Sequence, residues 1–264
     1  MPFIALAPRG SSGEIRGMKR LERSLFKASC LALAVLLMGP HVMASGFDLK
    51  TQVEVYKLRY GLRDPYSKLV NYEGNGYEPL YGVRNFRVVL QGVYYRGGSN
   101  NTHNRYDVRK NSNPLEGEAL VNLCKEGFSE SVYLYATNYR SEPHSITCRT
   151  RAGETNHLQY RQINALLGHN EHEQLTRIFD HIKGKMPGPI YDHCWNGWHA
   201  SGYIAAMSLI QFCGFTHAQA DAYWVKNTDG NYTKESGIRK KLAAFKPFSD
   251  LQITKSERDL ICPN

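Results

Sequence analysis

One stretch of the sequence, residues 189–214, most constrains how this chain can fold. PIYDHC is apolar up to Cys194, a glycine follows at Gly197, and SGYIAAMSLIQFCG is apolar on nearly all sides. A short apolar strand that turns through glycine into an apolar helix is typical of sheets that helices cover. We therefore expect a strand ending at Cys194, a tight loop, and a buried central helix that ends at Gly214.

Strand and helix patterns alternate through the preceding and following residues. Strands are predicted at 86–98, 131–139 and from 157, with a loop at 139–156. Helices are predicted from Asn113-Pro114 to Gly127, over 171–184, from Thr216 to Trp224, and around Ile238, Leu242 and Phe245. This order predicts an α/β fold with a mainly parallel central sheet and helices on both faces.

The first 44 residues are typical of an export signal. Four basic residues precede the apolar run 28–38, namely Lys19, Arg20, Arg23 and Lys27. Val42 and Ala44 provide small side chains at the −3 and −1 positions, so we expect cleavage after Ala44, with Met18 as an alternative start. The apolar run is short for a bilayer span, so a periplasmic or secreted protein without a stable membrane span is expected and a retained anchor is the alternative.

Residues 45–85 are rich in Tyr, Gly, Arg and Asn without a sustained period. They predict an irregular, strand-containing N-terminal extension that packs on the main domain, residues 86–264. Loss of residues 1–44 lowers the formal charge from +9 to +5. No Lys/Arg run has the density of a nucleic-acid-binding arm, so we expect no nucleic acid partner and a weak preference for anions.

Five cysteines follow the expected cleavage site: Cys124, Cys148, Cys194, Cys213 and Cys262. Disulfides persist in exported proteins. An odd number allows two bridges and one free thiol, and the spacing does not fix the pairing. Cys194 is our candidate for the free thiol.

The loop after Cys194 has a specific physical use. Backbone N–H groups at the N-terminus of a helix converge on one point, where the helix dipole adds positive potential. Such a loop holds phosphate or another oxyanion, and the same field favours the nucleophilic thiolate. The expected ligand-binding residues are Trp195, Asn196, Gly197, Trp198, His199, Ala200 and Ser201.

The loop resembles the signature of protein tyrosine and dual-specificity phosphatases: His-Cys, two residues, Gly, two residues, Arg, then Ser or Thr. His193, Cys194, Gly197 and Ser201 match it in register. A looser similarity over 86–245 implies that residues 86–264 form a dual-specificity-phosphatase-like domain. The resemblance implies that Cys194 attacks phosphorus to form a phosphocysteine. It also implies that His193 shapes the loop and the acidity of the thiol, and that Ser201 assists release of the thiolate.

Two features depart from that signature. Ala200 occupies the position of the arginine, which removes a planar bidentate clamp on the phosphoryl oxygens. The resemblance also implies a general-acid aspartate in a loop before the helix predicted at 171–184, but no aspartate occurs between Asp107 and Asp180. Glu171 or Glu173 could replace it, although both positions are typical of first-turn helix acids.

We therefore expect an exported pseudophosphatase whose Cys194 loop binds a phosphorylated or other anionic ligand, with phosphoester hydrolysis impaired or lost. The alternative is an active cysteine-dependent phosphatase, a hydrolase of phosphotyrosine or other phosphomonoesters. It would recruit a basic residue such as Arg96, Arg149 or Arg151 from another loop. A further alternative is an exported thiol redox protein, although no CxxC accompanies Cys194.

Other patterns in the sequence are weaker. Trp195 and Trp198 either wall a ligand pocket or pack the loop against the core. The histidines and the cysteine of the loop do not match a recognised zinc spacing, so no metal or other cofactor is expected. NTDGNYT at 227–233 lacks the spacing of a calcium loop and predicts an Asp-Gly turn.

Overall fold

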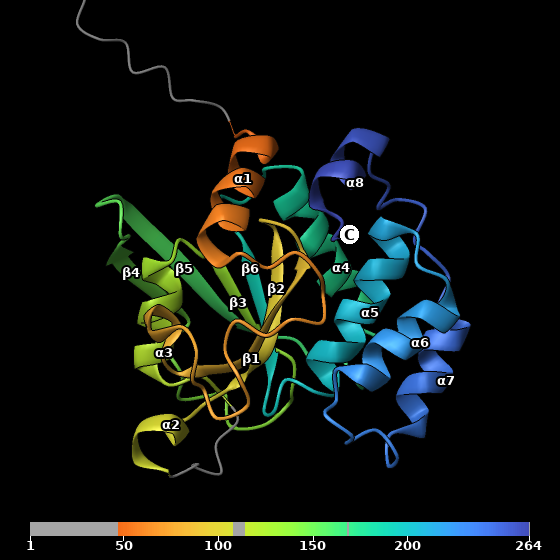
Figure 1. Ribbon diagram of the computed structural model, residues 1–264, viewed down its shortest axis with the longest axis horizontal. Helices are drawn as coiled ribbons and strands as arrows, with labels where there is room; N and C mark the ends of the chain where they lie inside the picture. The colour runs from red at the N-terminus through yellow and green to blue at the C-terminus, as the bar shows by residue number, and fades with distance from the viewer. Residues whose placement is uncertain (1–46, 108–113, 168, 264) are drawn as a thin grey trace, which may run out of the picture. The chain divides into compact units, whose positions relative to one another are not determined.

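The computed structural model describes residues 47–107, 114–167 and 169–263 (Figure 1). The expected export signal and its cleavage site after Ala44 lie outside these residues. The strands are β1 (Val83–Leu90), β2 (Tyr94–Ser99), β3 (Glu130–Tyr133), β4 (Ser145–Arg149), β5 (Thr155–Gln162) and β6 (Ile190–Cys194). The helices are α1 (Leu49–Tyr60), the 3-10 turn η1 (Glu78–Leu80), α2 (His103–Tyr106), α3 (Gly117–Lys125), α4 (Glu171–Ile182), α5 (Ala200–Cys213), α6 (His217–Lys226), α7 (Ser236–Ala244) and α8 (Lys255–Ile261). None of the helices in the described ranges is long and apolar enough to cross a membrane.

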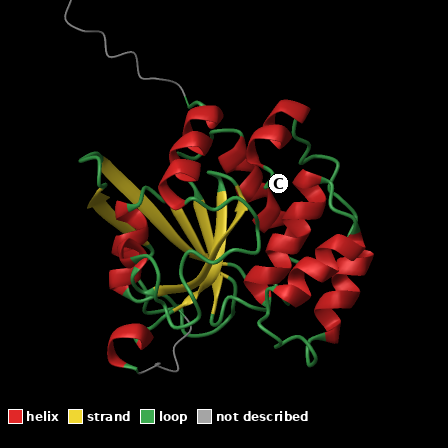
Figure 2. Ribbon diagram, viewed as in Figure 1, coloured by secondary structure: helices red, strands yellow, loops and turns green. Residues whose placement is uncertain are grey.

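The six strands form one sheet in the order β1-β2-β6-β3-β5-β4. Figure 2 shows the strands in yellow with the helices in red around them. The four central strands, β2, β6, β3 and β5, run parallel, and the edge strands β1 and β4 pair antiparallel with their neighbours. β6 lies between β2 and β3, so Cys194 lies at the carboxyl end of a central strand. The predicted α/β fold with a mainly parallel sheet is confirmed.

Helices cover both faces of the sheet, as predicted. On one face, α4, α5 and α6 enclose a hydrophobic cluster that includes Cys194. On the other face, α1 and α3 enclose a second cluster that includes Tyr191. Because side chains alternate along a strand, the residues of β6 are divided between these two cores.

The unit formed by β6, its loop and α5 follows the prediction closely. All five residues of β6 are buried, and only the last residue of α5 is not. Gly214 ends α5 with φ +73°, the left-handed conformation that glycine adopts at helix C-termini. The predicted capping box of Thr216 and Gln219 is present at the start of α6.

Several predicted element boundaries are wrong, among them that of the strand predicted at 131–139, which ends at Tyr133. Residues 86–98 form parts of two strands, because Gly92 turns the chain at φ +69° and a β-carbon there would lie 2.6 Å from Val53 Cα. The predicted loop 139–156 contains β4, whose half-exposed pattern gave no apolar signal. The helix expected from Pro114 begins at Gly117, and Asn113 lies outside the described residues.

The extension before residue 86 contains a helix that its composition did not reveal. Helix α1 is capped by Asp48, whose carboxylate accepts from the N–H groups of Lys50 and Thr51. It buries only Val53, Tyr56 and Tyr60, so its apolar periodicity is weak. Further along the extension, one isolated β-bridge joins Val70 to Phe86 and covers the outer edge of β1.

Two disulfides join Cys124 to Cys148 and Cys213 to Cys262. Cys194 is the free cysteine of the described residues, as expected.

Candidate functional site

Cys194 lies at the end of β6 with only 2% of its surface exposed. Its Sγ is 3.4 Å from Ser201 Oγ in the first turn of α5. The Ser201 hydroxyl donates to the carbonyl of Gly97 across 3.0 Å. Because that proton is engaged with Gly97, Ser201 presents a lone pair to Cys194, and this arrangement suits a thiol that donates to Ser201.

Side-chain donors from the β1–β2 hairpin hold the carbonyl oxygens of the loop. Arg84 donates from Nε and Nη2 to Trp195 O at 3.2 and 3.1 Å. Asn85 Nδ2 donates to the Asn196 carbonyl at 2.7 Å. Arg96, through Nη1, donates to the carbonyl of Gly197. These three successive carbonyls are therefore turned toward the hairpin.

The backbone N–H groups on the other side of the loop have no such partners. In the part of the chain that the structure describes, the N–H groups of Gly197, Trp198, His199 and Ala200 donate to no protein acceptor. They precede the 14-residue helix α5, whose N-terminus carries a partial positive charge. The loop thus offers a row of donors beside the Cys194 thiol, which is the arrangement that binds oxyanions.

Glycines on two segments allow the loop to lie against β2. Gly197 has φ +76°, and a β-carbon there would lie 2.6 Å from the Gly97 carbonyl carbon. A β-carbon on Gly98 would lie 2.5 Å from Trp195 O. The YYRGG pattern, which the sequence presents as the end of a strand, therefore makes room for the loop.

Three buried guanidinium groups lie on this hairpin. Arg84, Arg87 and Arg96 are at most 1% exposed. Arg96 donates from Nε to Tyr223 OH at 3.0 Å, and its buried Nη2 has no hydrogen-bond partner within the described ranges. No carboxylate of the described ranges forms an ion pair with Arg96. Burial, followed by the charge of Arg96, lowers the pKa of Arg87 to about 9.

His193 is neutral and faces away from the thiol. Burial lowers the pKa of His193 to about 3. Its Nε2 lies 2.9 Å from Tyr160 OH, and its Nδ1 lies 3.4 Å from its neighbour's carbonyl, Cys194 O. Because both ring nitrogens are engaged in the opposite core, His193 supports the loop from behind and has no contact with Sγ.

The aromatic residues of the loop are held by packing and hydrogen bonds. Trp198 stacks on Tyr72 with ring centroids 5.3 Å apart, and its Nε1 donates to Asp229 at 3.1 Å. The neighbouring His199 points away from the thiol, because its Nε2 lies 2.6 Å from the carbonyl of Asn231. The interpretation that Trp198 packs the loop is therefore favoured.

The two glutamates considered as proton donors, Glu171 and Glu173, are poorly suited to act as a general acid. Burial raises the pKa of Glu171, but hydrogen bonds from its own N–H and from Tyr203 and the charge of Lys241 outweigh burial and leave it lowered. Glu171 is consequently ionised at neutral pH. Glu173 is exposed and pairs with Arg177 at 3.7 Å.

Of the three residues considered as substitutes for the missing arginine, Arg96, Arg149 and Arg151, only Arg96 contacts the loop. Arg149 pairs in register with Thr155 at the start of β5, so it lies at the opposite end of the sheet from Cys194. Arg151 forms an ion pair with Glu126. Both line a surface cavity of about 500 Å³ that includes no residue of the loop.

No pattern in the sequence singles out Arg84, Asn85, Tyr72 or Asp229 as residues of the site. Each acts on the loop from a distant segment, and only the pairing of β2 with β6 brings the hairpin to it. Among the described residues there is no cluster of three His, Cys, Asp or Glu side chains that could hold a metal ion.

Comparison with known proteins gives few matches. No family model matches the chain, and no curated protein does. Among solved structures, P. aeruginosa TpbA aligns with 63% of this chain and 88% of its own at 14% identity and a TM-score of 0.38. A Cys-to-Ser variant of TpbA in complex with pTyr aligns with 65% of this chain and 96% of its own at 13% identity and a TM-score of 0.35.

Proposed function

We propose that this chain is an exported oxyanion-binding protein whose Cys194 loop takes a phosphate monoester or a similar anion, with phosphoester hydrolysis impaired or lost. The observation that carries the proposal is the orientation of the loop backbone. Hairpin side chains engage the carbonyls at 195–197, and the N–H groups at 197–200 have no acceptor among the described residues.

Buried positive charge supports the same ligand class. A fully buried guanidinium without an ion pair is costly, and an anion beside it lowers that cost. Arg96 is such a group and lies directly behind Gly197. A bound anion would act as its counter-charge across the loop.

Three features support impaired hydrolysis. Ala200, at the position that the resemblance gives to arginine, is completely buried. The Ser201 proton is engaged with Gly97 and not with the thiol. Glu171 is ionised and cannot donate a proton to a leaving group. Loss of one hydrogen-bond donor to the transition state, as where Ala200 stands in place of arginine, costs about 3–4 kcal/mol of transition-state stabilisation.

The two disulfides support export, because such bonds persist in oxidising compartments. They also weigh against the redox alternative, since they leave Cys194 without a second described thiol that could resolve an oxidised form.

The second candidate, an active phosphatase, is favoured by one observation. Arg96 brings a guanidinium with an unpartnered Nη2 to the underside of the loop. In that role it would supply the positive charge that position 200 lacks, although its Nη1 already serves the Gly197 carbonyl.

Calorimetry with tungstate, a phosphate analogue, and turnover of p-nitrophenyl phosphate and phosphotyrosine separate these candidates. We expect tungstate binding at one site, weakened in Arg96→Met, with negligible turnover. Turnover that Cys194→Ser abolishes would establish the active phosphatase. Absence of tungstate binding together with absence of turnover would overturn both candidates. Ala200→Arg is the gain-of-function variant.

A further inference from the structure

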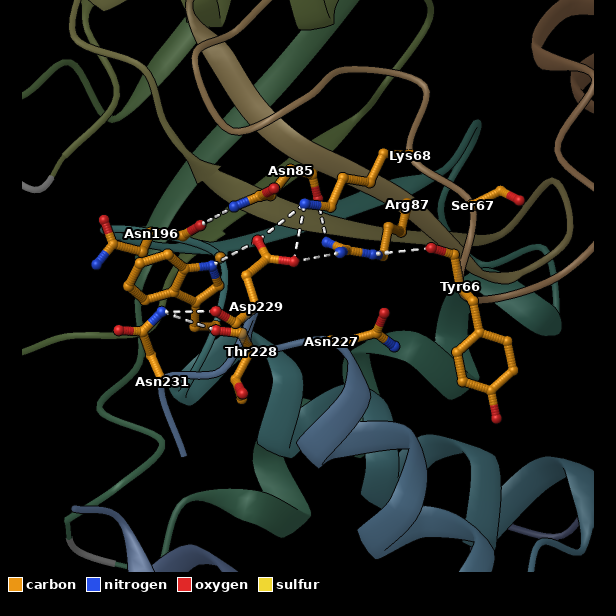
Figure 3. A network of polar contacts seen from close by, with 12 residues as sticks. Tyr66, Ser67, Lys68, Asn85, Arg87, Asn196, Asn227, Thr228, Asp229 and Asn231 are labelled. Carbon is orange, nitrogen blue, oxygen red and sulfur yellow. Dashed lines mark hydrogen bonds and ion pairs between the residues drawn. The ribbon is translucent and has the colours of Figure 1, made fainter. Parts of the chain in front are cut away.

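Asp229 is the centre of a polar network beside the Cys194 loop (Figure 3). Its carboxylate accepts from Lys68 Nζ at 2.9 and 2.8 Å and from Trp198 Nε1 at 3.1 Å. Arg87 Nη2 lies 3.7 Å from Asp229 Oδ1. One carboxylate thus connects the N-terminal extension, strand β1 and the loop.

The backbone around Asp229 fixes the direction of its side chain. Asp229 has φ +51°, a conformation that few residues other than glycine adopt, and Gly230 follows at φ +86°. The side-chain Nδ2 of Asn231 donates to the carbonyls of Thr228 and Asp229, each at 3.1 Å. Asn227 and Thr228 are buried, so the turn is anchored immediately before Asp229. The predicted Asp-Gly turn is present and serves to aim a carboxylate.

The same segment also holds the residue after Trp198. His199 Nε2 lies 2.6 Å from the carbonyl of Asn231, and its Nδ1 lies 3.7 Å from Glu235 Oε1. Two consecutive loop residues are therefore held through their side chains by residues 229–235. Their backbone N–H groups belong to the unpartnered row described above.

Charge makes this contact stronger than a neutral one. Burial raises the pKa of Asp229, but its hydrogen bond to Lys68, the Lys68 charge and the Trp198 indole outweigh burial, and the pKa is lowered. Asp229 is thus ionised at neutral pH, and hydrogen bonds to ionised acceptors are stronger than those between neutral groups.

We propose that Asp229 is a positioning residue: through Trp198 it fixes the loop N–H groups in the arrangement that binds the anion. The inference rests on the proposed oxyanion-binding function. Fixing donors before the ligand arrives lowers the ordering cost of binding, so the network raises affinity without touching the anion.

Asp229→Asn tests the proposal, because asparagine also tolerates positive φ and keeps an acceptor but loses the charge. We expect tungstate affinity to fall about tenfold. Asp221→Asn is the matched control: Asp221 forms a two-point ion pair with Arg239, and its side chain is 27% exposed against 31% for Asp229. The control should change affinity less than about twofold.

Trp198→Phe retains an aromatic ring on Tyr72 and removes the indole N–H. If Asp229 acts through Trp198, the double variant with Asp229→Asn binds tungstate about as weakly as either single variant. The proposal would be overturned if the two substitutions lowered tungstate affinity independently, so that their effects multiplied in the double variant. It would also be overturned if Asp229→Asn bound tungstate as tightly as wild type. Lys68→Met serves as a second variant that weakens the network from the other side if Asp229→Asn fails to fold.

Two measurements without ligand separate this proposal from the proposed function. One is the alkylation rate of Cys194 in the full chain, followed on its own peptide, and the other is hydrogen exchange of the amides at 197–200. Both should rise in Asp229→Asn and not in Asp221→Asn. If wild type binds no tungstate, the proposed function fails while these rates still test the network. Unchanged rates would overturn the positioning role.

Discussion

Tyr160 and His193 share a hydrogen bond of 2.9 Å between hydroxyl oxygen and Nε2, in the core on the side of the sheet opposite Cys194. Burial lowers the pKa of His193 to about 3, from an ordinary value of 6.5. Between these two pH values the unfolded chain binds a proton that the folded chain does not. The stabilisation that neutral His193 gives the fold is therefore complete above pH 6.5 and is lost as the pH falls toward 3.

The first prediction concerns how His193 makes the free energy of unfolding depend on pH. His193 should make the free energy of unfolding fall by about 1.4 kcal/mol for each pH unit within this window. His193→Phe retains the ring stacking and cannot titrate, so its curve should lack this contribution. Urea unfolding of both proteins from pH 4 to 8 measures the difference, and parallel curves would contradict it.

Asp192, the preceding residue of β6, should show the opposite dependence. Burial raises the pKa of Asp192 well above its ordinary value of 3.8, so the folded chain keeps a proton that the unfolded chain releases. Stability from Asp192 is then lost as the pH rises above 3.8. Asp192→Asn imitates the protonated acid and keeps the contact with Gln174, which lies 2.7 and 2.8 Å from the two carboxyl oxygens. The variant should be at least as stable as wild type at pH 7 by urea unfolding. Clear destabilisation there would show that Asp192 is ionised in the fold.

The third prediction concerns the space beneath the loop. Gly98→Ala should weaken tungstate binding severalfold and cost about 1–3 kcal/mol in unfolding free energy, because the new methyl group meets Trp195 O at 2.5 Å. Gly117→Ala is the control, since nothing lies within 4 Å of its added β-carbon. It should be neutral or stabilising. Equal effects of the two substitutions would show that the close approach does not shape the site.

The fourth prediction concerns the bridge between α5 and the residue after α8. Cys213 and Cys262 are 49 residues apart, and opening a loop of that length costs about 4 kcal/mol in the chain-entropy model. The Cys213→Ala, Cys262→Ala double variant should therefore lower the unfolding free energy by about that amount. Calorimetry measures this loss, and an unchanged melting temperature would contradict it.

The sequence predicted the parts of the fold that depend on local patterns. The apolar run into Cys194, the helix ending at Gly214 and the capping box of Thr216 and Gln219 are all read within a few residues. Helix α1 was not predicted because its apolar residues do not gather on one face: it buries one valine and two tyrosines, whereas Val55 and Leu58 are exposed. Strand β4 was not predicted from the sequence because it is a half-exposed edge strand.

The candidate site could be predicted only in its loop. The free thiol of Cys194 and the glycine turn at Gly197 follow from the sequence. Arg96 was one of three basic residues considered for the loop, but Arg84 and Asp229 were not, because they reach it through sheet pairing and loop packing. Such contacts join residues about 30 to 110 positions apart, and no local pattern encodes them.

The β-bridge between Val70 and Phe86 has a consequence for association of the protein with itself. β1 is an edge strand with all eight residues buried, and the extension supplies the cover, with Leu69 donating to the Phe86 carbonyl at 3.0 Å. Removal of residues 47–82 would leave this strand edge with unpaired backbone groups. Such edges recruit strands from other molecules, so the extension protects the folded chain from edge-to-edge aggregation.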